Sequence, residues 1–297
     1  MRGSRYVLDD DRVTIRGKDL LFTRRARGTP GNAHGGSIGA VYAALVPENS
    51  QCIAKITVVF KSKTYVEMWS RIEILEKGTK AQMWRGNELL SQADLILVPT
   101  LARKPLSSPA ALGAVCMENV RTQHKDWTRV RMPDFEVARA ITPERLAAGY
   151  SHFEFHNKPR MIFQETLLNA DAAQETAETI SVLYVSPFAG SDRAGVDRVA
   201  EGALWTAADE IMGATVNKIF FQPLVTGSLQ LEYYASIGFE YPGASVALYL
   251  KTSVRRAAPD SRRVLVQCDC YTIGPKGEPG VKVMHAESTF VLLEGKL

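Results

Sequence analysis

Residues 33–45 read AHGGSIGAVYAAL, and residues 197–213 read DRVAEGALWTAADEIMG. Both stretches consist mostly of small and apolar residues, which predicts two buried helices. Each is followed by several extended runs that are separated by glycine, proline and other turn residues. The order of one helix followed by several long strands therefore occurs twice along the chain, although the two halves share almost no sequence identity.

The strands that follow the helices predict an α+β fold rather than a parallel α/β sheet, because strand and helix do not alternate. We expect two antiparallel sheets, each wrapped around a long central helix, that pair edge to edge into one continuous sheet without an exposed edge between them. The second helix is expected at 192–213, with Ser191 as its cap and Gly213 at its end. The strands are expected at 52–61, 65–76, 79–85, 90–98, 227–236, 244–255, 263–273 and 281–293.

The length of 297 residues suits two units of ordinary domain size. We expect an N-terminal subdomain at 1–100, a connector at 101–149 and a C-terminal subdomain at 150–297. The connector is expected because this stretch carries Pro105, Pro109, Pro133 and Pro143 and shows little hydrophobic periodicity.

Composition excludes several classes of protein. The net charge of +4 comes without a long basic run, which argues against nucleic-acid binding, and no apolar run approaches the ~18 residues of a membrane span. None of the 4 cysteines lies in a CxxC pattern, so we expect reduced thiols, no metal, no bound cofactor and a cytoplasmic location. The last residues, Gly-Lys-Leu, resemble a peroxisomal ending and keep that location open.

The stretch AHGGSIGAVYAAL resembles the start of the central helix in hotdog thioesterases, which often read HGG before a small-residue helix. The stretches FEFHNKPR, ISVLYVSPF and DRVAEGALWTAADEIMG resemble the second half of type II acyl-CoA thioesterases. The resemblance implies a double hotdog protein of the thioesterase/thiol ester dehydratase-isomerase superfamily. It implies an acyl-CoA or acyl-carrier substrate, and hotdog proteins commonly assemble further, so a homo-oligomer is possible.

The candidate site begins at the first helix. Its N-terminus offers free backbone N–H groups with the helix dipole behind them, and Gly35 and Gly36 leave room for a thioester carbonyl to approach. We expect these two glycines to stabilise an oxyanion, with His34 as an auxiliary group and Ser37 as a substrate-binding residue.

The second helix supplies the acid. Asp209 shares a helix face with Trp205 and Met212, whose apolar surroundings would raise its pKa, so Asp209 is the expected base or nucleophile and Trp205 a substrate contact. Glu210 points to another side, where it would be solvated or paired. The first helix has HGG without an acid, and the second has an acid without HGG, so the two halves predict one shared site. The alternative interpretation is a structural aspartate bonded to a neighbouring strand.

The resemblance also implies a set of an aspartate, a hydroxyl residue and a glutamine, which we place on the strands after the second helix. Ser228 or Leu229 stands at the first position and Thr252 or Ser253 at the second, so Ser228 and Thr252 are candidate substrate contacts. Thr289 or Phe290 stands at the third position. Two of these three roles are therefore missing, and either the site has moved to His34 and Asp209 or hydrolysis is lost.

Three functions follow. The first is an acyl-thioester hydrolase. The second is a dehydratase, isomerase or cyclase of polyketide-type secondary metabolism, with His34 abstracting a proton and Asp209 protonating the leaving hydroxyl. The third is a protein that binds acyl groups without catalysis.

Overall fold

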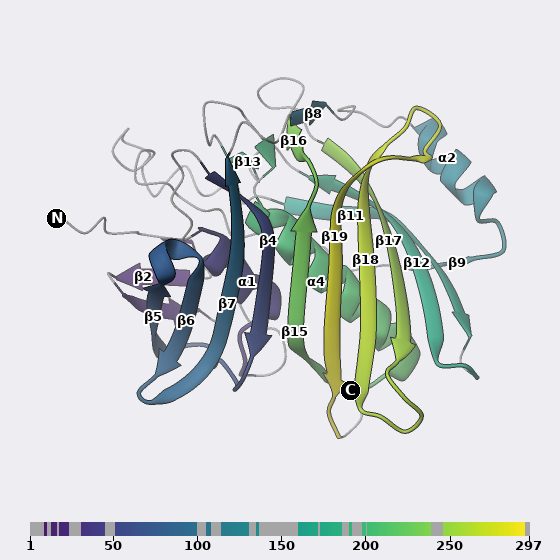
Figure 1. Cartoon of the computed structure of the whole chain (residues 1–297). Coiled ribbons are helices and arrows are strands. Elements are labelled where there is room, and N and C mark those ends of the chain that lie inside the picture. Colours follow the sequence, from purple (N-terminus) through teal and green to yellow (C-terminus); the bar gives the residue numbers. More distant parts are fainter. Residues whose placement is uncertain are drawn as a thin grey trace.

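A computed structural model describes residues 9–10, 13–16, 18–23, 31–44, 51–99, 105–107, 114–130, 135–136, 160–171, 173–185, 190–191, 198–199, 201–238 and 246–294. Its centre is one large antiparallel sheet that curves around two helices, α1 (Gly35–Ala44) and α4 (Glu201–Phe220) (Figure 1). The apolar faces of the sheet and of both helices share one core, which explains why neither helix has a wide polar face.

The strands of the first half lie at one end of this sheet, and those of the second half at the other. From the first edge the order is β1 (Asp9–Asp10), β2 (Val13–Arg16), β3 (Asp19–Phe22), β5 (Trp69–Leu75), β6 (Lys80–Arg85), β7 (Glu88–Pro99) and β4 (Gln51–Phe60). It continues with β15 (Leu224–Tyr233), β19 (Pro279–Leu292), β18 (Arg263–Ile273), β17 (Val246–Arg256), β12 (Thr176–Val185), β11 (Arg160–Asp171) and β10 (Phe135–Glu136), while β9 (Thr128–Arg129) also pairs with β11.

The two halves join where β4 pairs with β15, in register from Ser228 opposite Val59 to Glu232 opposite Lys55. Lys55 Nζ also lies 2.8 Å from Glu232 Oε1 across this junction. The expected edge-to-edge pairing is therefore present, and the described strands of the two halves form one sheet rather than two. A second, small sheet contains β13 (Gly190–Ser191), β14 (Arg198–Val199), β16 (Ser236–Gly238) and β8 (Pro105–Ser107).

The helices differ from the expectation in length and position. Helix α1 has 10 residues and only α4, with 20, is long. The predicted bounds 192–213 are wrong at both ends, because Ser191 and Arg198 pair as short strands and α4 continues beyond Gly213. The turn after Gly213 buries Thr215 and Val216 completely, and this burial offsets the low helix propensity of glycine, which costs about 1 kcal/mol.

The strands agree with the sequence pattern within a few residues, and β18 agrees at both ends. The main difference is the run expected at 65–76, which begins only at Trp69 because the preceding residues form a turn in which Glu67 has a φ of 60°. This strand also ends at Leu75, one residue earlier than expected, because a 3-10 turn follows it at Glu76–Gly78.

The connector is more ordered than expected. It contains helix α2 (Ala114–Gln123), which lies on the opposite face of the sheet from α4 (Figure 1). Val120 of α2 packs there against a second core that includes Ile180, Val182 and Tyr249. The subdomain limits at 100 and 150 stay a prediction. No helix among the described residues has the length and apolarity needed to cross a bilayer.

Candidate active site

The N-terminus of α1 meets the middle of α4, and this contact brings His34 and Asp209 together. His34 Nε2 lies 3.0 Å from Asp209 Oδ2. The backbone N–H of Gly36 donates to the same oxygen over 2.7 Å. The sequence placed these groups in different halves of the chain, and the fold joins them at one point.

His34 depends on glycine at position 36. A Cβ built at Gly36 would lie 2.8 Å from both Cε1 and Nδ1 of the imidazole, closer than real contacts of this kind. The imidazole ring therefore occupies the space that any other side chain at this position would need. The His34 side chain keeps 20% of its surface exposed, so it lies at the edge of the core.

Asp209 is a buried acid with several donors. Its side chain is 1% exposed, and it lies among buried neighbours that include Trp205 and Met212, as the helix pattern predicted. Burial raises the pKa of Asp209, and the negative charge of Glu210 raises it further. His34 and the hydrogen bonds from Thr226 and Gly36 oppose this effect, because they favour the carboxylate.

Trp205 fills the contact between the helices. Its Nε1 donates to the carbonyl oxygen of Gly35 over 3.4 Å. A Cβ at Gly39 would lie 1.8 Å from this same nitrogen, so the indole needs glycine there. Thr206 donates to the carbonyl of Gly36 over 3.4 Å. These contacts fix α1 on α4 and thereby the position of His34.

Thr226 belongs to the site, although the sequence pattern did not single it out. Its Oγ1 donates to Asp209 Oδ1 over 3.1 Å. In β15 the regular alternation that buries Leu229 and Leu231 would turn Thr226 outward. A bulge between Thr226 and Ser228 shifts the register and turns Thr226 toward Asp209. The glycine between them was the one available signal, since glycine inside a strand often marks a bulge.

Glu210 is paired, one of the two states that the sequence allowed. Its Oε1 lies 3.4 Å from His34 Nε2, and its side chain is 29% exposed. The imidazole nitrogen therefore faces two carboxylates from consecutive residues of α4.

The remaining candidates lie in different places. Gly35 and Ser37 are buried at the start of α1, beside the His34–Asp209 contact. Thr252 is buried on the inner face of β17, next to Thr179, which hydrogen-bonds Thr215 of α4 over 3.1 Å. Among the described residues, no hydrogen bond or ion pair joins Thr252 or Ser228 to His34 or Asp209, whose partners are Gly36, Thr226 and Glu210.

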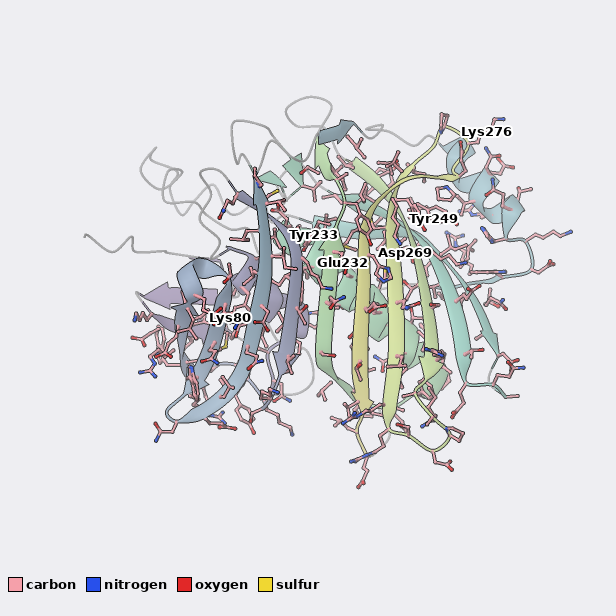
Figure 2. All side chains as sticks on the ribbon, viewed as in Figure 1. Lys80, Glu232, Tyr233, Tyr249, Asp269 and Lys276 are labelled. Carbon is pink, nitrogen blue, oxygen red and sulfur yellow. The ribbon has the colours of Figure 1, made fainter. Side chains whose placement is uncertain are left out.

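Ser228 faces the other side of the sheet. Figure 2 views the sheet from this side, opposite α4, with Glu232 labelled on β15 and Asp269 on β18. A groove of about 760 Å³ runs over this face, and its lining includes Ser228, Ser253 and Thr289. Leu229 and Phe290, their alternatives in the sequence, belong to the core. The alternation of strand residues thus separates this polar set from Asp209.

The described residues hold no group of three or more histidine, cysteine, aspartate or glutamate side chains that could bind a metal ion. Cys52, Cys268 and Cys270 are buried free thiols. Burial raises the pKa of Cys268 to about 12, so this thiol stays protonated and unreactive at neutral pH.

Several solved structures share this architecture. A conserved protein of unknown function with a hot dog fold from Alicyclobacillus acidocaldarius has a TM-score of 0.54 at 13% identity, covering 96% of this chain and 98% of that one. A protein provisionally named thioesterase II from Thermobifida fusca has a TM-score of 0.53 at 11% identity, covering 98% and 99%. The tesB protein of Mycobacterium avium subspecies paratuberculosis has a TM-score of 0.53 at 8% identity, covering 95% and 96%.

No protein-family model and no curated protein sequence matches the chain. The solved structures, at these identities, establish the fold alone. The chain has the hotdog fold.

Proposed function

We propose that this protein is an acyl-thioester hydrolase that acts on acyl-CoA or carrier-bound acyl substrates. The observation that carries the proposal is the 3.0 Å contact between His34 Nε2 and Asp209 Oδ2, which joins a histidine of one half to an acid of the other. A structure provisionally named thioesterase II shares the fold over nearly its whole length, which adds support to this reaction class.

Solvent exposure decides which of His34 and Asp209 acts as the base. Asp209 is enclosed, and both its oxygens already accept hydrogen bonds, whereas His34 is partly exposed. His34 is therefore the group that can reach a water molecule, and Asp209 is the group that holds the imidazole. This arrangement exchanges the roles that the sequence suggested, in which Asp209 was the base and His34 the auxiliary.

The proposed reaction proceeds in two steps. In the first, His34 Nδ1 takes a proton from water while the water oxygen attacks the thioester carbonyl, and Asp209 accepts the hydrogen bond of the protonated ring through Nε2–H. In the second, the tetrahedral intermediate expels the thiolate, which takes the proton back from the imidazolium. The products are a carboxylic acid and a free thiol, so atoms and protons balance.

The two glycines have different roles in this proposal. The N–H of Gly36, expected as an oxyanion donor, is used here to hold Asp209. Gly35 carries the first N–H of α1 and remains the proposed oxyanion donor, with the helix dipole behind it. Ser37 and Trp205 stay proposed substrate contacts on the same two helices.

Thiol release from a panel of acyl-CoA thioesters, from short to long and aromatic, tests the proposal. We expect release by the wild type and a loss of about 10²-fold or more in Asp209→Asn and His34→Asn. His285→Asn is the matched control, because His285 also pairs with an aspartate, Asp269 at 2.6 Å, but on the outer face of the sheet. No release from any substrate by folded wild-type protein would exclude hydrolysis.

A second reaction, dehydration of a β-hydroxyacyl thioester, is favoured by one feature: the Gly36 N–H is already engaged by Asp209, which leaves only one of the two expected oxyanion donors. In that reaction the partly exposed His34 would take the proton from the α-carbon and return it to the leaving hydroxyl, since Asp209 is enclosed. Incubation with β-hydroxyacyl thioesters separates the two reactions. Hydrolysis yields free thiol, whereas dehydration yields an enoyl thioester and water without free thiol.

A further inference from the structure

One nitrogen of His34 faces two carboxylates. The distance from Nε2 is 3.0 Å to Asp209 Oδ2 and 3.4 Å to Glu210 Oε1. A single N–H can direct its bond well to only one of these oxygens at a time. The second carboxylate is therefore in excess of what is needed to orient a neutral ring.

The two carboxylates have different surroundings. Asp209 is 1% exposed and receives hydrogen bonds from Gly36 and Thr226. Glu210 is 29% exposed, and among the described residues its contact is the ion pair with His34. Asp209 is thus fixed by the fold, while Glu210 acts on the ring through its charge.

We infer that Glu210 is a positioning residue that, together with Asp209, stabilises the protonated form of His34 and sets the pH range in which the site works. The inference rests on the proposed function for its kinetic consequence. In the proposed hydrolysis the ring gains a positive charge as water is deprotonated, so a second nearby anion lowers the energy of that charged state. The gain is limited because water reaches Glu210 and screens its charge.

Other charged groups near His34 are few in the described part of the chain. Helix α4 contributes Asp209 and Glu210, and β15 contributes the neutral hydroxyl of Thr226. The turn before β5 lies beside the loop that carries His34, through the bridge between Asn32 and Tyr65. Arg85 lies 4.8 Å over the Tyr65 ring, and its charge is paired with Glu88.

A charge series at position 210 tests the inference, because a purely structural role would not follow charge. Glu210→Gln keeps the shape and removes the charge, and Glu210→Lys reverses it, while all three residues are good helix formers. The NMR titration of the His34 imidazole in the unliganded protein is the first readout, with His34→Asn for assignment. We expect the midpoint to fall in Glu210→Gln and to fall further in Glu210→Lys, because the nearby negative charge is first removed and then reversed.

The second readout is the pH profile of thiol release. The acid limb of kcat should move to lower pH in the same order, with kcat at its plateau reduced a few-fold and KM unchanged, because Glu210 contacts His34 rather than the substrate. Glu232→Gln is the matched control, since Glu232 is a paired carboxylate on the outer face of β15. Its profile should coincide with that of the wild type.

The two readouts separate the possible failures. His34 midpoints that coincide in the wild type, Glu210→Gln and Glu210→Lys would overturn the role of Glu210, whatever the reaction is. Ordered midpoints with no thiol release from any substrate would support the role of Glu210 and refute hydrolysis. Active variants whose pH profiles overlay that of the wild type would also overturn the inference.

Discussion

Helices α1 and α4 occupy corresponding places in the two halves, yet they contribute different chemistry. Helix α1 is 10 residues long, has no charged residue, and offers backbone N–H groups and a preceding histidine. Helix α4 is twice that length and carries a buried acid at its middle. The halves share an architecture, but each lacks what the other supplies.

The contact between the helices explains why this division gives a single site. Small residues on α1 allow close approach, so that Trp205 lies against Gly39 and Gly202 lies against Ala40. This approach places the N-terminus of α1 within hydrogen-bond distance of Asp209. Two helices with large side chains at the contact would pack farther apart and would leave the acid and the histidine separate.

The largest expected effect comes from filling the space between Gly39 of α1 and Trp205 of α4. Gly39→Ala would place a methyl group 1.8 Å from Trp205 Nε1, deep in the core, and the helices would have to separate. We expect a loss of about 1–3 kcal/mol or more in the free energy of unfolding, measured by urea denaturation, together with loss of thiol release. An unchanged unfolding midpoint would contradict the described packing of α1 on α4.

A smaller effect tests the hydrogen bond that Thr226 of β15 donates to Asp209. Thr226→Val removes the hydroxyl that donates to Asp209 Oδ1 without changing the shape of the side chain. We expect kcat to fall about tenfold, because the carboxylate loses a donor and part of its orientation. Thr226→Ser keeps the hydroxyl and should retain most of the activity. Equal loss in both variants would point to packing rather than the hydrogen bond.

A glycine-to-alanine substitution at Gly213 of α4 should stabilise the protein, whereas the one at Gly39 of α1 should destabilise it. A Cβ at Gly213 would meet its nearest neighbours, on Phe290 and Leu224, at 3.6–3.8 Å, which is ordinary van der Waals contact. Gly213→Ala should therefore stabilise the protein by about 0.5–1 kcal/mol through helix propensity. Urea denaturation beside Gly39→Ala gives the comparison, and destabilisation by Gly213→Ala would show that α4 has no spare room there.

The smallest effect concerns the free-energy cost of burying the Asp209 carboxylate. Because the pKa of Asp209 is raised above its ordinary value of 3.8, the folded protein binds more protons than the unfolded chain between these two pKa values. Stability of the wild type therefore falls as pH rises through this window.

In Asp209→Asn this loss is absent, and the amide can still accept from Gly36 and donate to Thr226. The Tm of the variant relative to the wild type should increase with pH, by up to about 4 °C, while activity is lost. A difference in Tm that stays constant with pH would show that Asp209 does not titrate in this way.

The sequence was sufficient for α1 and for the long strands because their signals are local. Small and apolar residues after HGG predicted α1, and turn residues bounded the long strands, so β18 could be placed at both ends. The α+β class followed from the order of these elements, and the helix face shared by Asp209, Trp205 and Met212 followed from the helical period.

Helix α2 could not be placed from its own sequence, because its packing depends on a distant strand. A signal did exist in β12, where the run ISVLYV is apolar on both faces. Ile180 and Val182 pack outward against the core under α2, while Leu183 and Val185 pack inward against α4. A strand that is apolar on both faces predicts cover on both sides, which here comes from the stretch interpreted as a connector.

By itself, the sequence determined which residue types were available: glycines where a helix begins, a histidine before them, and an acid inside an apolar helix. Tertiary structure alone decided that His34 meets both Asp209 and Glu210, that Gly36 donates to the acid, and that a bulge turns Thr226 inward. Local propensities act over a few residues, whereas these contacts join positions up to 176 residues apart (210 − 34 = 176). Their distances are set by the packing of α1 on α4 and by the register of β15, which no local pattern encodes.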